Sequence, residues 1–169
     1  MRLYAGKVAS IATEVVRVLT AGEQIDVSAP REAEADVASV LTQYLNDDRE
    51  ASERAKEIIE STGRSQSEFG RIKALAAAEK GIKTGDEALD YLLDQVVEML
   101  HYSQNIDEIF CEDVELRRLM APVFKKHMAE GDALDGEVRA QLRHLKEGTR
   151  DWDIEYGKVM ELTRRKKGL

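Results

Sequence analysis

Apolar residues recur along the chain at spacings of three and four positions, which is the pattern of helices that bury one face. In the first half this pattern predicts a helix from about Ala5 to Ala21, a long helix that Pro30 opens and Gly63 stops, and a third helix from about Ser65 to Lys80. The apolar positions of the long helix are spaced almost as a heptad, so we expect it to pack along another helix in coiled-coil fashion. The segment 25–27, between the first two helices, is either a short edge strand or an extended linker.

The second half of the chain follows the same plan. A capping box from Thr84 to Glu87 precedes an apolar face from Ala88 to Leu100. A long helix is then expected from about Glu112 to Lys146, and a last helix reaches about Arg165. The sequence therefore predicts an all-α fold of six helices, with one long helix in each half.

Two details of the second half depend on single residues. Pro122 and Gly131 lie inside the second long helix, where they favour a kink or a break. The apolar residues keep one phase across Gly131, so we expect one bent, continuous helix. Either Thr149 or Asp151 caps the last helix.

A repeated segment relates the two halves. Residues 68–75, Glu-Phe-Gly-Arg-Ile-Lys-Ala-Leu, reappear as residues 155–162, Glu-Tyr-Gly-Lys-Val-Met-Glu-Leu, and Gly81 is matched at the same offset by Gly168. The earlier parts of the halves match at an offset of 81 residues as far as Ile25, and at 83 beyond it. Amphipathic helices can be slid into register without common origin, but the aromatic-glycine pair does not follow from amphipathicity. We therefore expect two tandem three-helix repeats, residues 1–83 and 84–169, packed as one domain.

The repeated aromatic-glycine pairs are predicted to be packing residues. A glycine inside a helix costs roughly 1 kcal/mol relative to alanine, so a repeated one suggests close approach of another backbone. We expect Gly70 and Gly157 to face a neighbouring helix, with Phe69 and Tyr156 wedged beside them.

Charge and composition limit the functional classes. The 169 residues carry 25 Lys and Arg against 33 Asp and Glu, a net charge of −8 that repels nucleic acid and anionic membranes except at a local patch. The apolar stretch from Val8 to Leu19 is interrupted by Glu14 and Arg17, which argues against a signal peptide, and no run reaches the roughly 18 apolar residues of a membrane span. A single cysteine, Cys111, suits a reducing compartment. We expect a cytoplasmic protein without a membrane segment.

The titratable residues form no catalytic or metal-binding pattern. The histidines share no metal-ligand spacing and are interpreted as structural: His101, His127 and His144. Asp151, Asp153 and Glu155 are spaced like calcium ligands, but the glycine and glutamate that an EF-hand needs later in its loop are missing, so they are interpreted as first-turn acids. Neither a phosphate-binding loop nor a nucleophile elbow is present. We expect no enzyme activity, cofactor or metal.

Two further groups of residues remain open. Trp152 is either a core anchor or a partner contact, and the basic tail from Arg164 through Arg165 and Lys166 to Lys167 either serves a helix C-terminus or binds phosphates or an acidic partner. Acidic residues gather near the predicted start of the fifth helix, where we interpret them as a solvated face: Asp107, Glu108, Glu112, Asp113 and Glu115.

Several motifs together resemble a known family. They are Met1-Arg2-Leu3-Tyr4 with Gly6-Lys7-Val8, Phe69-Gly70-Arg71-Ile72-Lys73, Asp86-Glu87-Ala88-Leu89 with Leu93-Asp94-Gln95, Ala121-Pro122-Val123 with Lys125-Lys126-His127, Glu147-Gly148-Thr149, Trp152, Glu155-Tyr156 and Arg164-Arg165-Lys166-Lys167-Gly168-Leu169. The whole chain is similar to the uncharacterised bacterial proteins grouped as the domain-of-unknown-function family numbered 507. The resemblance implies a bacterial protein and carries no activity or site residues with it.

The expected function is that of a non-catalytic helical interaction or adaptor protein that binds another protein. The alternative is a nucleic-acid-associated or ribosome-associated factor that uses the basic tail. The sequence does not indicate the oligomeric state.

Overall fold

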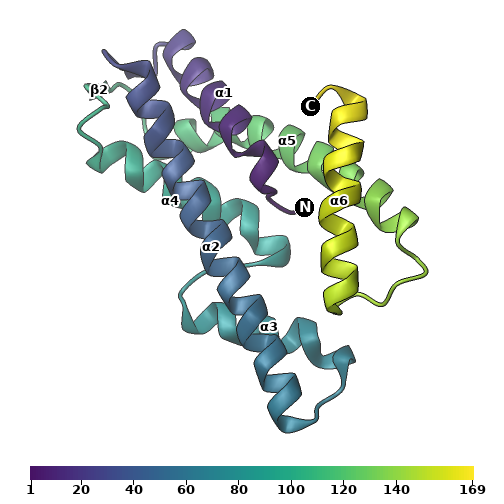
Figure 1. Ribbon diagram of the computed structural model, residues 1–169. Coiled ribbons are helices and arrows are strands. Elements are labelled where there is room, and N and C mark those ends of the chain that lie inside the picture. The colour runs from purple at the N-terminus through teal and green to yellow at the C-terminus, as the bar shows by residue number, and fades with distance from the viewer.

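A computed structural model describes residues 1–169 and shows an all-helical chain, as expected (Figure 1). The six helices are α1 Val8–Ala21, α2 Pro30–Thr62, α3 Phe69–Glu79, α4 Ala88–Tyr102, α5 Asp113–Gln141 and α6 Arg150–Lys167. Short 3-10 turns precede α1, α3 and α4, at Ala5–Lys7, Gln66–Glu68 and Gly85–Glu87. No helix is long and apolar enough to cross a membrane.

Two very short strands join the halves. Strand β1, Ile25–Asp26, pairs antiparallel with β2, Glu108–Ile109, and this pairing sets Ile25 opposite Ile109 and Asp26 opposite Glu108. The segment after α1 is thus an edge strand. Ile25 is buried in the main core, whereas Asp26 and Glu108 are exposed.

The helix ends follow local rules in part. Pro30 stands in the first turn of α2 and Gly63 ends that helix in a left-handed conformation, as expected. The Ser65 hydroxyl accepts a hydrogen bond from the Ser67 amide at 3.2 Å. The capping box predicted at Thr84 is wrong: Thr84 makes no capping hydrogen bond, because Gly85 takes a φ of 65° where a capping box needs a helical residue.

Helix α5 is continuous through Pro122 and Gly131, as expected, but it ends at Gln141 and not near Lys146. At Leu142 the chain tightens, and the Leu142 amide bonds the Arg139 carbonyl three residues back at 3.0 Å. Leu142 stays buried within this turn. The apolar phase that suggested a longer helix therefore continues in a segment that is no longer helical.

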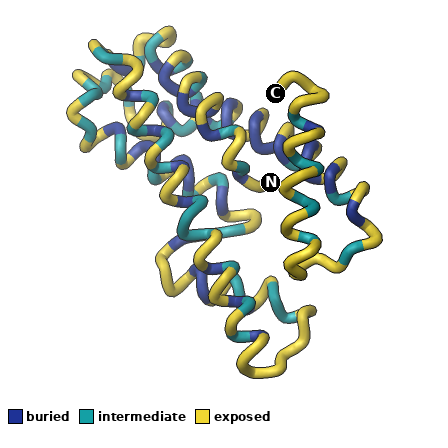
Figure 2. The backbone as a smooth tube through the Cα atoms, viewed as in Figure 1, coloured by how far each residue is buried: buried dark blue, intermediate teal, exposed yellow.

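Four helices enclose the main core. Helices α1 and α4 each pack on both α2 and α5. The fully buried side chains between them include Leu19, Leu41, Leu92 and Phe124. Figure 2 shows the buried positions as stripes along the facing sides of these helices.

Two arms extend from this core (Figure 1). Helix α3 packs on α2 over a small apolar cluster of Ala55, Ile59 and Ile72, against which Phe69 is half-buried. Helix α6 packs on α5, and its only buried residue is Thr163. Helix α6 is therefore held mainly by half-buried and polar side chains.

The expectation that Gly70 and Gly157 face a neighbouring helix is wrong. Both are exposed, and a Cβ added at either would meet no atom within 4 Å. The close approach occurs at Gly131 in α5, where an added Cβ would lie 2.4 Å from the ring of Tyr4. The aromatic neighbours do pack: Phe69 lies on the α3 cluster, and Tyr156 lies between α6 and α5.

Candidate functional site

Trp152 and Tyr156 form an aromatic contact on α6. Their ring centroids are 4.8 Å apart with planes inclined by 22°. The Arg139 guanidinium of α5 lies 5.2 Å from the Trp152 ring centroid and 6.0 Å from that of Tyr156. Both rings are half-buried, so Trp152 takes part in attaching the last helix to α5.

Asp135 lies at the centre of this attachment. It is buried in α5 and accepts hydrogen bonds from the Tyr156 hydroxyl and, at 2.7 Å, from Arg139 Nε. Burial and the bond to Asp135 raise the pKa of Tyr156. Burial alone would lower the pKa of Arg139, but its hydrogen bonds to Glu147 and Asp135 raise it. The buried carboxylate is thus paired with a cation and a phenol inside the protein.

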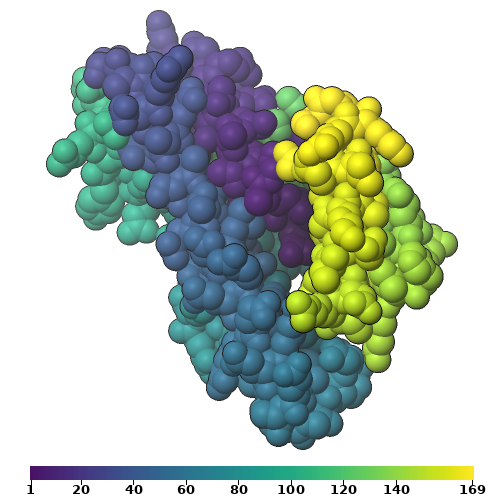
Figure 3. All heavy atoms as spheres, viewed as in Figure 1, coloured from purple at the N-terminus to yellow at the C-terminus, as the bar shows by residue number.

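The first residues of the chain lie along the same helix. The Tyr4 hydroxyl donates to Asp132 at 3.0 Å, the Arg2 amide reaches the same carboxylate at 3.2 Å, and Lys7 pairs with Glu130 at 2.6 Å. In Figure 3 these N-terminal residues, in purple, occupy the recess between α2, in blue, and α6, in yellow. The N-terminal segment therefore lies between α2 and α6.

The basic tail is the last turn of α6, so its cations stand at a helix C-terminus. Lys167 pairs with Glu137 of α5 at 2.5 Å, and Arg165 pairs with Glu161 at 2.9 Å. The Arg164 guanidinium lies within 2.9 Å of the position that a Cβ on Gly6 would take. Two of the four tail cations thus form ion pairs within the chain, and Arg164 lies against Gly6.

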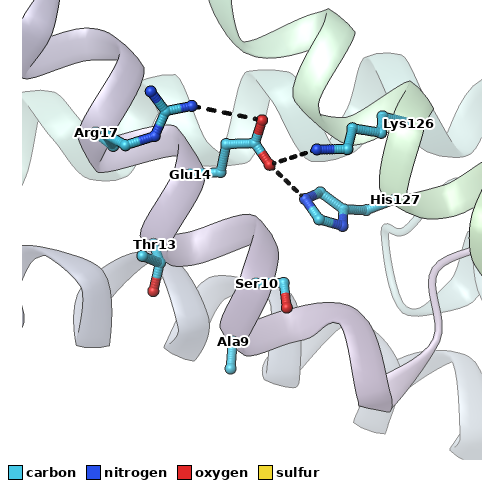
Figure 4. Close-up of a pocket in the computed structure, with 7 residues that line it drawn as sticks. All are labelled: Ala9, Ser10, Thr13, Glu14, Arg17, Lys126 and His127. Atoms are coloured by element: carbon cyan, nitrogen blue, oxygen red, sulfur yellow. Dashed lines mark hydrogen bonds and ion pairs between the residues drawn. The ribbon is translucent and has the colours of Figure 1, made fainter. Parts of the chain in front are cut away.

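An open depression between α1 and α5 contains an acid and a histidine (Figure 4). The Glu14 carboxylate receives His127 Nε2 at 2.7 Å and Lys126 at 3.3 Å, and it lies 3.7 Å from Arg17. The hydrogen bond from His127 holds the pKa of Glu14 below its usual value.

Neither ring nitrogen of His127 is available to a molecule bound in this depression. His127 is 7% exposed, its Nε2 is bound to Glu14, and its Nδ1 is buried without a hydrogen-bond partner, 3.6 Å from Glu130. A general base needs a nitrogen within reach of its substrate. The pair is therefore best explained as a hydrogen-bonded contact between α1 and α5. No group of three or more His, Cys, Asp or Glu side chains is placed to hold a metal ion, and Asp151 and Asp153 lie in the first turn of α6.

A different feature stands at the strand end of the molecule, near β2 in Figure 1. Three large apolar side chains are exposed there: Tyr102 by 82%, Phe110 by 57% and Val114 by 76%. We call these three residues the ribbon patch. They occupy the end of α4, the residue after β2 and the first turn of α5.

The backbone that carries the ribbon patch is fixed by hydrogen bonds. His101 Nε2 lies 2.6 Å from Asp113, which ties the end of α4 to the start of α5. The Phe110 amide donates to the Gln24 carbonyl at 2.8 Å. The backbone at the ribbon patch is therefore held to α4, α5 and the segment after α1.

The fold and these contacts define an all-helical protein whose helices are joined by polar clusters and whose strand end carries an exposed apolar patch. The chain belongs to the DUF507 family, described as "Protein of unknown function", whose sequence pattern matches residues 1–169. The resemblance seen in the sequence is thereby confirmed over the whole chain. A comparison with curated proteins finds no match.

Sequence reasoning did not single out the ribbon patch. Its signal was present as Tyr102, Phe110 and Val114 interspersed among the acidic residues that were assigned to a solvated face. A regular spacing of apolar residues predicts which of them face the core. These three residues lie at or beyond the ends of helices and strands, where the spacing predicts no buried face.

Proposed function

We propose that this protein is a non-catalytic adaptor that binds another protein through the ribbon patch. The observation that carries the proposal is the exposure of three large apolar side chains beside a well-packed core. Large exposed apolar side chains that gather in one region of a protein surface are typical of interaction sites, and these three fall within residues 102–114. Tyrosine and phenylalanine are also among the residues enriched in protein interfaces.

The nucleic-acid alternative is less well supported. A phosphate-binding surface would need unpaired cations, but Lys167 of the tail is paired with Glu137. Two other candidate cations, Lys7 and Lys73, are paired with Glu130 and Asp48. Each pair removes a charge that counterion release would require. We assign Lys167 to holding α6 on α5, and Arg164 to the contact of α6 with the N-terminal segment.

We further propose that residues 1–83 and 84–169 are tandem repeats that share one domain. Each half contains a helix, a short strand, a long helix and a third helix in the same order. Helix α1 packs on α2, the long helix of its own half, and on α5, the long helix of the other half. Helix α4 likewise packs on α5 of its own half and on α2 of the other half. The matched Gly81 and Gly168 both take left-handed conformations, at φ 75° and 68°. The strands start at Ile25 and Glu108, 83 residues apart, so the change of offset precedes the strand and does not follow Ile25, where the sequence comparison placed it.

Coiled-coil-like packing of the long helices is part of this proposal. The buried positions of α2 are spaced by three, four or seven residues: Ala33, Val37, Leu41, Tyr44, Ala51, Ala55 and Ile59. This seam supports packing of the kind that a heptad gives. We also propose that the protein acts in the cytoplasm, which its single unpaired cysteine supports.

The test is affinity purification of the full chain from its source cells, comparing three forms. The first is the unchanged protein, and the second carries Tyr102→Ser, Phe110→Ser and Val114→Ser. The third, a matched control, carries Leu75→Ser and Leu162→Ser, at apolar residues exposed by 59% and 56% away from the ribbon patch. Circular dichroism verifies that all three fold.

A protein recovered in stoichiometric amount with the unchanged and control forms, and lost with the patch variant, supports the proposal. A fourth form with glutamine at the four tail cations tests the alternative. Recovery of nucleic acid or ribosomes alone, lost only from the tail variant, would overturn protein docking at the patch.

A further inference from the structure

We propose that the ribbon patch takes a basic amphipathic segment of another protein, one that presents apolar side chains together with lysine or arginine. This inference rests on the proposed docking function and names the chemistry of the partner. The apolar anchors come from the patch itself. The preference for cations comes from the carboxylates around it.

The chain around the patch is acidic, and only some of its carboxylates have a partner. Residues 101–116 include five carboxylates and neither lysine nor arginine. Glu115 is paired with Arg118 at 2.5 Å, and Asp113 is bonded to His101. Glu108 and Glu112 are exposed and form neither an ion pair nor a side-chain hydrogen bond.

The strand pairing adds an unfavourable contact. Asp26 and Glu108 are directly opposite each other in the ribbon, and both are exposed without a cation partner. Like charges at directly opposed positions destabilise an antiparallel pair. A cation placed between the two carboxylates by a partner would replace this repulsion with attraction on both sides.

The negative potential extends inward to the neighbouring thiol. Cys111, half-buried beside Phe110, has a pKa raised by burial and by the carboxylates of Glu115, Asp113 and Glu112. Arg117 precedes Arg118 in α5, and its guanidinium is bound to Asp90 and Asp94 of α4. Arg118 thus offsets Glu115, whereas Glu108 and Glu112 form no ion pair with a cation of the chain.

Charge complementarity of this kind selects the partner. An apolar surface with a negative rim attracts basic segments and repels acidic ones during encounter and in the bound state. An acidic amphipathic segment could reach the same apolar side chains only by bringing its carboxylates near Glu108 and Glu112. A basic one pairs with them.

The experiment measures binding of two synthetic peptides to the full-length chain by fluorescence anisotropy. Both are about 16 residues long, enough to form an amphipathic helix. One is built of leucine and lysine, and the other has glutamate at every lysine position. Three proteins are compared: the unchanged chain, a variant with Asp26→Asn and Glu108→Gln, and a control with Glu60→Gln and Asp86→Asn. The control carries the same change in net charge at exposed carboxylates that have no ion pair.

The lysine peptide should bind the unchanged and control proteins alike, and about tenfold more weakly to the Asp26→Asn, Glu108→Gln variant at about 0.1 M salt. That variant should unfold at an equal or higher temperature than the unchanged protein, since a repulsive pair has been removed. This separates lost binding from lost folding.

Other outcomes overturn the inference in distinguishable ways. Equal binding of the glutamate peptide, sensitive to Tyr102→Ser and Val114→Ser, would leave the docking function standing and refute the preference for cations. Equal weakening in the control would show attraction by net charge alone and refute the site. Absence of binding by either peptide would count against the docking function as well. Self-association that blocks the lysine peptide and is lost from the patch variant would identify a second copy as the occupant and refute the proposed partner.

Discussion

Alanine at two glycines of α5 should change stability in opposite directions. Gly136 is exposed within the helix, and an added Cβ would meet nothing within 4 Å. Gly136→Ala should therefore gain about 1 kcal/mol, the difference in helix propensity. Gly131 is buried, and its added Cβ would lie 2.4 Å from Tyr4 Cδ2 and 3.0 Å from Tyr4 Cε2.

The magnitude at Gly131 depends on what holds the Tyr4 ring. Carbon atoms in contact prefer about 3.5–4.0 Å, so the ring must shift by about 1 Å or more. The ring is half-buried and its hydroxyl donates to Asp132 at 3.0 Å. A hydrogen bond to a charged group contributes about 1.5–3 kcal/mol, which exceeds the propensity gain of about 1 kcal/mol. Gly131→Ala should thus lower the free energy of unfolding by about 0.5–2 kcal/mol.

Urea unfolding followed by circular dichroism and by Trp152 fluorescence measures both variants. In a chain of this size a change of 1 kcal/mol moves the melting temperature by about 2–4 °C. A double-mutant cycle gives the sharper test: with Tyr4→Ala present the obstacle is gone, and Gly131→Ala should become stabilising. The reasoning is refuted if Gly131→Ala stabilises the otherwise unchanged protein as much as Gly136→Ala does.

Three further predictions concern titratable groups. Asp135→Asn should lower the free energy of unfolding by about 1.5–3 kcal/mol, because the Tyr156 hydroxyl and Arg139 lose a charged acceptor while Arg139 keeps its pair with Glu147. The same change should bring the raised pKa of Tyr156 part of the way back toward its ordinary value in an ultraviolet titration, because burial of the ring remains. The hydrogen bond from His127 lowers the pKa of Glu14 in the folded state. Glu14 therefore contributes stability that is present above the pKa of an unfolded glutamate and is lost as the pH falls through the lower, folded pKa. Glu14→Gln should reduce this loss of stability in acid, and an unchanged acid-unfolding curve would contradict it. Burial raises the pKa of Tyr44 to about 12, so the folded state keeps its proton longer than the unfolded state and stability falls as pH rises above about 10; Tyr44→Phe should flatten this alkaline loss in melting temperatures measured between the two pH values.

Local rules explain why most helix boundaries could be predicted. The spacing of apolar residues, Pro30 at a helix start and Gly63 at a helix end each act within one or two turns of chain. The prediction at Thr84 failed for an equally local reason, the left-handed Gly85. The end of α5 was placed too late because a buried side chain, Leu142, kept the helical phase beyond the helix.

The packing role of the glycines could not be predicted in the same way. Whether a glycine allows close approach depends on which distant segment lies over it, and Tyr4 is far from Gly131 in sequence. Gly70 and Gly157 occur in the repeated segment, at equivalent positions, but each lies on the exposed side of its helix. Likewise, Asp135 accepts a hydrogen bond from the Tyr156 hydroxyl only because α6 packs on α5 at that turn. These are tertiary facts that periodicity does not contain.

The register of the two strands sets the carboxylates of Asp26 and Glu108 opposite each other, at the proposed binding site for a basic partner. Strands of two residues are too short to be stable through their own hydrogen bonds, so the core must hold them in place. Ile25 is 3% exposed and belongs to the main apolar cluster. Because neighbouring side chains of a strand point to opposite faces, Asp26 must point outward, and the pairing sets it against Glu108. Packing inside the core thereby enforces a repulsive pair on the surface, and a partner's cation at that position would turn the repulsion into affinity.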